Sequence, residues 1–118
     1  MMRLSGMSIL SLITTGAKSG KKRTTILGKF DGGENSWLVV ASNAGMDWNP
    51  DWYYNLKKNP DKAWIKIGDQ TMKVQPEILQ GSEREDAWRH IVEKAPNYGA
   101  YEKKTDRQIP VIRLRILY

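Results

Sequence analysis

The stretch Gly16-Ala17-Lys18-Ser19-Gly20-Lys21-Lys22-Arg23-Thr24-Thr25 runs directly into a β-branched segment, so a turn is joined here to a strand. Two glycines and three hydroxyl residues stand among three lysines and one arginine. Small residues let backbone N–H groups approach an anion, and the cations neutralise its charge. The composition predicts an anion-binding turn, and the alternative is a basic hairpin turn that only contacts solvent.

The spacing of this turn excludes a nucleotide-binding P-loop. Three residues separate Gly16 from Gly20, whereas the P-loop pattern requires four, and Lys21 is followed by Lys22 rather than by a hydroxyl residue. A P-loop also opens a helix, whereas residues 23–30 are rich in β-branched side chains and predict a strand.

Composition narrows the class of protein further. A length of 118 residues predicts one domain, residues 1–118, and the net charge of +6 favours an anionic ligand. The absence of cysteine and the single histidine, His90, exclude a thiolate nucleophile and disfavour a zinc site, so no metal is expected. The N-terminal residues 1–13 resemble a signal peptide but lack its cleavage site, so we expect a cytoplasmic protein with no stable membrane association.

Hydrophobic patterning predicts an α+β fold with a mostly antiparallel sheet, because hairpins dominate the chain. The expected strands are residues 8–15, 23–31, 36–42, 64–67, 71–79 and 110–118, with a short helix as the alternative for the first half of residues 8–15. The expected helices are residues 50–58 and 82–95, and residues 97–104 form a short helix or a loop. Six strands with two or three inserted helices indicate a small or partly closed barrel.

Local signals predict particular features of these elements. A hairpin should join the second strand to the third, and the third should be buried on both faces. Asn49 is the expected N-cap of the first helix, and Ser82 with Glu85 forms a capping box for the second.

The chain shows no catalytic dyad or triad, so the chemistry is expected to belong to a cofactor. Ser42-Asn43-Ala44-Gly45 follows the buried strand and predicts a turn with free N–H groups, while Trp52 and Tyr53 open a helix nearby. Tyr98 and Tyr101 lie one helical turn apart and could face one pocket or remain on the surface. The pair Asp106-Arg107 predicts a local ion pair or a turn cap.

Four motifs together resemble the deazaflavin (coenzyme F420)-dependent nitroreductase family: residues 15–25, 41–45, 49–56 and 105–111. The resemblance implies the split β-barrel fold and the cofactor F420, which carries a phosphate and an oligoglutamate tail. It places the residues matching Lys18, Ser19, Arg23, Thr24 and Thr25 at the phosphate and tail. It places those matching Ala41, Ser42 and Asn43 near the ring, and those matching Trp52, Tyr53 and Asn55 beside the cofactor.

The full set of expected site residues follows from the motifs and the resemblance together. The cofactor-binding candidates are Ala17, Lys18, Ser19, Lys21, Arg23, Thr24, Thr25, Ile26, Ala41, Ser42, Asn43, Asp51, Trp52, Tyr53 and Asn55. The catalytic candidates are Tyr101, Ser42 and Tyr98. Lys22 stands where many relatives have proline, and Gly28 where some have a tyrosine, so the substrate pocket is expected to differ from theirs.

The resemblance implies an F420H2-dependent oxidoreductase that passes a hydride to a quinone, an enone or a nitro compound, without naming the physiological acceptor. The same fold with FMN or FAD is the first alternative, since the basic turn suits any phosphate. A cofactor carrier without turnover, or a basic barrel that binds single-stranded nucleic acid, is an alternative from another class. Nucleic acid is not the expected partner, and a homodimer is.

Overall fold

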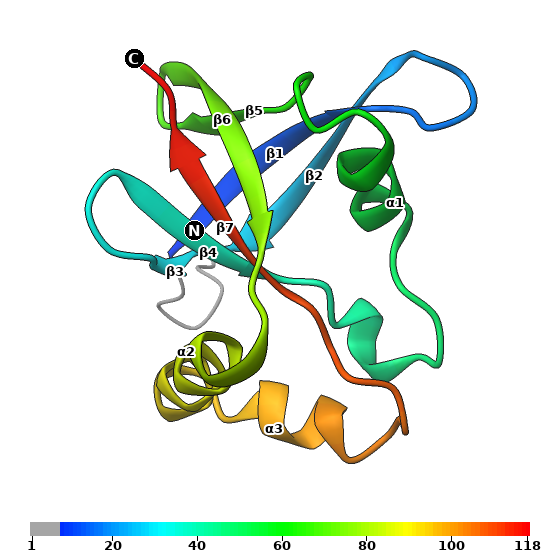
Figure 1. Ribbon diagram of the computed structural model, residues 1–118, viewed down its shortest axis with the longest axis vertical. Coiled ribbons are helices and arrows are strands. Elements are labelled where there is room, and N and C mark those ends of the chain that lie inside the picture. Colours follow the sequence, from blue (N-terminus) through cyan, green and yellow to red (C-terminus); the bar gives the residue numbers. More distant parts are fainter. Residues whose placement is uncertain (1–7) are drawn as a thin grey trace, which may run out of the picture.

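The computed structural model describes residues 8–118 and shows a strongly curled antiparallel sheet with helices at two of its margins (Figure 1). The strands are β1 Ile9–Thr15, β2 Lys22–Gly28, β3 Phe30–Asp31, β4 Ser36–Val40, β5 Trp64–Ile67, β6 Gln70–Ile78 and β7 Val111–Ile116. The helices are α1 Asp51–Lys58, α2 Gly81–Lys94 and α3 Asn97–Glu102, and a short 3₁₀ turn, η1, covers Asn43–Gly45.

All strand pairs are antiparallel, and the strands are ordered β2-β1-β5-β6-β7-β4-β3. The α+β class and the antiparallel half-barrel predicted from the hairpins are therefore confirmed. The sheet has seven strands rather than six, because the predicted strand 23–31 is interrupted at Lys29.

This interruption corrects the predicted hairpin between the second and third strands. β2 pairs with β1 along its whole length, and only Phe30 and Asp31 pair with β4. The backbone N–H of Lys29 bonds to the carbonyl of Ser8, in register with the β1–β2 pairing, and the chain then passes to the other edge of the sheet at Phe30. β4 lies between β7 and β3, and its two faces are buried as predicted, with Val39 in one core cluster and Leu38 and Val40 in another.

The core is divided by β4 and β7, whose successive side chains point to opposite faces. Val39 and Leu114 belong to a cluster inside the half-barrel that also contains Trp52 and Leu56 of α1. Val40 belongs to a second cluster, built against α2 and α3. β4 thus supports two cores, which explains its continuous hydrophobic sequence.

Two helix starts differ from the sequence expectation. Pro50, not Asn49, is the N-cap of α1, because the side chain of Asn49 accepts a hydrogen bond from Arg107 instead. α2 begins at Gly81 after Gln80, and the capping box is absent because the Glu85 carboxylate pairs with Arg84 at 2.9 Å. In both cases an arginine binds the side chain that the sequence motif predicted as a helix cap. Arg107 binds Asn49, and Arg84 binds Glu85.

Among residues 8–118, no helix has the length and apolar character needed to cross a lipid bilayer. Residues 1–7 of the N-terminal segment compared above with a signal peptide lie outside the described residues.

Candidate functional site

A cavity of about 1000 Å³ lies between the β1–β2 hairpin and α1, which face each other at the right of Figure 1. It is lined by Gly16, Ala17, Lys18, Ser19, Lys22, Arg23, Thr24, Thr25, Asp51, Trp52, Tyr54 and Asn55. The lining combines three cations and four hydroxyl groups, one of them the phenol of Tyr54, with one carboxylate. Such a surface attracts a ligand that carries several negative charges.

The turn of the hairpin is held by its own backbone. The N–H of Gly16 donates to the carbonyl of Lys21 at 2.8 Å, and the N–H of Gly20 donates to the carbonyl of Gly16 at 3.0 Å. The N–H of Lys21 donates to the hydroxyl of Ser19, and that of Ala17 to the side chain of Asn55. These four N–H groups are therefore occupied, whereas within residues 8–118 the N–H groups of Lys18 and Ser19 have no acceptor and stay available to an anion together with the side chains.

Asn55 joins the two walls of the cavity. Its side-chain carbonyl accepts the N–H of Ala17 at 2.9 Å, and its NH₂ group donates to the Thr14 hydroxyl at 3.1 Å. The side chain is buried, so both bonds are shielded from water. These two bonds fix α1 to the β1–β2 hairpin. Because the cavity lies between α1 and the hairpin, the bonds also set its width.

Beyond the N-terminus of α1, the loop from β4 to α1 carries the Ser42 motif. Arg107 holds this loop: its guanidinium donates to the carbonyls of Ala41 at 3.2 Å, Ser42 at 2.9 Å and Met46 at 2.8 Å, and to the side-chain oxygen of Asn49 at 2.6 Å. The predicted local pairing of Arg107 with Asp106 is therefore wrong. Burial is the main influence on the Arg107 guanidinium, and it lowers its pKa.

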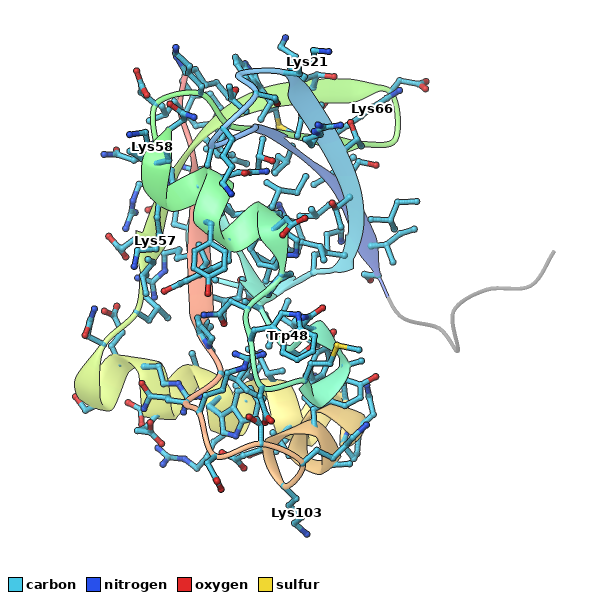
Figure 2. All side chains as sticks on the ribbon, turned by 90° about the vertical axis from the view of Figure 1, so that its right-hand side faces the viewer. Lys21, Trp48, Lys57, Lys58, Lys66 and Lys103 are labelled. Carbon is cyan, nitrogen blue, oxygen red and sulfur yellow. The ribbon has the colours of Figure 1, made fainter. Side chains whose placement is uncertain are left out.

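The same loop exposes an aromatic side chain. Trp48 is 61% exposed and lies between α1 and α3 on the face turned to the viewer in Figure 2. Met46 and Tyr54 are also exposed apolar residues of this region. An apolar surface thus adjoins the loop, whereas the hairpin side of the cavity is basic.

The structure brings together nine of the predicted cofactor-binding residues around one cavity. They are Ala17, Lys18, Ser19, Arg23, Thr24, Thr25, Asp51, Trp52 and Asn55. The Ala41, Ser42 and Asn43 group lies in the β4–α1 loop and does not line this cavity.

Three other candidates do not line the cavity either. Lys21 sits at the end of the hairpin and points outward at the top of Figure 2. Ile26 is 63% exposed on β2, and Tyr53 is buried in the inner core. Tyr98 and Tyr101 pack edge to face, with ring centroids 5.7 Å apart, and Tyr98 is buried in the core under α2.

Four residues of this region were not among the named site candidates, although all four lie in the sequence motifs. Gly16 and Lys22 line the cavity from the hairpin, and Tyr54 lines it from α1. The spacing of Asp51, Tyr54 and Asn55 at i, i+3 and i+4 places them on one helical face and would have identified Tyr54. Arg107 gave no local signal, because its partners lie 58–66 residues away along the chain.

The fold and cavity together define a class: an antiparallel half-barrel with a site for a polyanionic cofactor. A family model described as F420H(2)-dependent quinone reductase matches residues 1–115. The chain is 39% identical over 108 residues to an F420H(2)-dependent quinone reductase of Mycobacterium tuberculosis, which covers 89% of this chain and 71% of the relative. The chain belongs to the F420H(2)-dependent quinone reductase family.

Solved structures agree with this assignment. A structure of an F420-H2 dependent reductase (FDR-A) aligns with a TM-score of 0.80 at 40% identity, covering 91% of this chain and 93% of that one. A second structure, described as a domain-swapped dimer, also gives 0.80 at 40% identity and covers 91% of this chain and 79% of that one. The expected split-barrel fold and F420-dependent reductase class are confirmed, and FMN receives no support.

The donor set of the cavity suits this cofactor. F420 is the cofactor of the family, and its phosphate and glutamate tail are anionic. Lys18, Lys22 and Arg23 supply three positive charges against the single carboxylate of Asp51. The residues present therefore fit a polyanion better than they would fit an uncharged ligand.

Proposed function

We propose that this F420-dependent reductase uses a quinone as its electron acceptor, with enones and nitro compounds as further acceptors of the same electron-poor class. The observation that carries the proposal is the basic cavity between the β1–β2 hairpin and α1, in a chain of this family. Bound F420H2 supplies the hydride. The chain itself supplies charge, orientation and a surface for the acceptor.

The basic wall holds the anionic end of the cofactor. Arg23 can form two parallel hydrogen bonds to a phosphate, while Lys18 and Lys22 act as point charges on carboxylates. The hydroxyls of Ser19, Thr24 and Thr25 line the same cavity and complete the donor set. Lys21 and Ile26 take part only if the hairpin end moves toward the tail.

At the other end, Ala41, Ser42 and Asn43 face the cofactor ring, with Trp52, Tyr53 and Asn55 supporting the helix beside it. We assign Ser42 and Tyr101 to hydrogen bonds with the ring or the acceptor, and Tyr98 to the acceptor pocket. Tyr98 is buried, so its side chain would have to move further than those of Ser42 and Tyr101 to contact an acceptor.

We further propose that residues 1–118 act as one domain in a cytoplasmic homodimer without stable membrane association. The domain-swapped dimer described for a structure at 40% identity supports pairing of two copies.

The decisive experiment is a titration of the purified protein with F420, FMN and FAD, in which binding is monitored by fluorescence. We expect micromolar or tighter binding of F420 and weaker binding of both flavins. Turnover of F420H2 is then measured with a quinone, an enone and a nitroaromatic compound. Absence of F420 binding would refute the proposed site. If F420H2 binds but no quinone oxidises it, the protein would instead be a cofactor carrier without turnover.

A further inference from the structure

We infer that Arg107 is a positioning residue for the bound cofactor ring: it holds two backbone carbonyls so that the N–H groups of Ser42 and Asn43 are presented to the ring. The inference rests on the proposed function, because it assumes that the β4–α1 loop faces the cofactor. It assigns a task to the residue of the 105–111 motif that makes four side-chain hydrogen bonds to this loop.

The guanidinium of Arg107 is fully engaged by this loop. Nε donates to the Met46 carbonyl, Nη1 to the Asn49 side chain, and Nη2 to the carbonyls of both Ala41 and Ser42. All three nitrogens therefore bond to groups between residues 41 and 49. Arg107 in this way determines the direction of two consecutive peptide groups.

The direction of the two carbonyls also fixes the direction of the N–H donors in the same peptide groups. The peptide bonds of the described chain are trans, so the C=O and N–H of each peptide group point in opposite directions. The carbonyl of Ala41 shares a peptide group with the N–H of Ser42, and the carbonyl of Ser42 shares one with the N–H of Asn43. Because both carbonyls point toward Arg107, both N–H groups point away from it.

These two N–H groups are not used inside the described chain. The N–H of Ala41 donates to the Pro110 carbonyl and that of Gly45 to the Ser42 carbonyl, but within residues 8–118 neither Ser42 nor Asn43 donates its backbone N–H. Two adjacent donors on one side of a fixed loop match the carbonyl groups of a flavin-like ring.

The loop would not hold this conformation unaided. Asn43 and Ala44 have positive φ values of 47° and 55°, which are costly for residues with a Cβ. Lys104 donates to the Ala44 carbonyl at 3.2 Å, and Thr105 donates to Asp47 at 2.9 Å, so neighbours of Arg107 bind the same loop. Within residues 8–118, however, Arg107 is the one side chain that bonds to the carbonyls of both peptide groups that carry the free donors.

The test compares Arg107→Met, Arg107→Lys and the control Arg115→Met. Arg115 is a half-exposed residue of β7, so its replacement removes the same charge without touching the loop. The readouts are F420 affinity, the absorption band of bound F420, and the rate of hydride transfer in a single turnover. Loss of two hydrogen bonds to the ring corresponds to about a tenfold weaker affinity.

We expect Arg107→Met to bind F420 about tenfold more weakly, with an absorption band moved toward that of the free cofactor. Arg107→Lys keeps the charge but lacks the planar fork, so it should resemble Arg107→Met. Arg115→Met should match the wild type throughout.

Two results would overturn the inference: wild-type absorption and transfer rate in Arg107→Met, or full recovery of both in Arg107→Lys. Unfolding midpoints are measured for each variant, and if Arg107→Met does not fold, the absorption band and transfer rate of Arg107→Lys decide between the outcomes. Failure of the wild type to bind F420 would instead contradict the proposed function, so the two failures are distinguishable.

Discussion

The two walls that flank the start of α1 are built by different means. The β1–β2 hairpin wall, residues 16–25, is held by bonds within its own turn and presents cationic side chains. The β4–α1 loop wall, residues 41–50, is held from 58–66 residues away by Arg107 and presents backbone N–H groups. A flexible anionic tail suits mobile charges, whereas a rigid ring suits fixed donors, so under the proposed function each wall would bind one end of the cofactor.

The largest expected effect concerns the charges of the hairpin wall. Replacing both Lys18 and Arg23 by Ala should weaken F420 binding about 100-fold, because charge-assisted hydrogen bonds are the strongest contacts available to the tail. FMN, which lacks the glutamate tail, should lose less. The measurement is fluorescence titration with both cofactors, compared with Lys57→Ala/Lys58→Ala, which removes two charges from the other end of α1 (Figure 2). Equal losses for F420 and FMN would remove the argument that the extra cations serve the tail.

Glycine substitution separates the two walls by their packing. Gly45 has φ +80°, and an added Cβ would lie 3.1 Å from Lys104 Cβ and 3.2 Å from the Tyr101 carbonyl oxygen. Gly20 has φ +71° but open space around it. Gly45→Ala should therefore lower the free energy of unfolding by about 2 kcal/mol and Gly20→Ala by about 1 kcal/mol. Denaturant unfolding measures both, and equal values would show that the loop wall is not tightly packed.

Asn55 tests the connection between α1 and the hairpin wall. Asn55→Ala leaves the Ala17 N–H and the Thr14 hydroxyl without their partner, which should cost about 1–2 kcal/mol of unfolding free energy. Asn59→Ala is the matched control, since its single bond to the Thr15 carbonyl is longer, at 3.3 Å, and only partly buried. If Asn59→Ala destabilised the protein as much, the buried tether would have no special role.

The smallest effect is a pH dependence on the α3 side. Burial, with a further contribution from Tyr101, raises the pKa of Tyr98 above its usual value. Above about pH 10 the unfolded chain releases this proton more readily than the folded one, so the free energy of unfolding should fall as pH rises. Tyr98→Phe should not show this loss. Its free energy of unfolding should therefore rise relative to that of the wild type between pH 8 and 11. A difference that stays constant with pH would contradict the burial of this hydroxyl.

The contrast between the walls also explains what could be predicted from sequence. The hairpin wall is encoded locally by Gly16, Gly20 and the β-branched strand after them, and the prediction of its position and charge agrees with the structure. The loop wall depends on Arg107, whose partners are distant, so local reasoning assigned it to Asp106. The break at Lys29 was missed for the same reason: the pairing of Phe30 with β4 is a property of the closed sheet and not of the segment.

That break has a consequence for how the sheet ends. The first and last strands of the order, β2 and β3, are consecutive along the chain and are separated only by Lys29. Exposed sheet edges are templates for unwanted strand addition by other molecules. Here the two edges are the two halves of one extended segment, so a single covalent link draws them together. A proline at position 29 would remove the N–H that bonds to Ser8, and we expect self-association through the loosened edges to be its first visible effect.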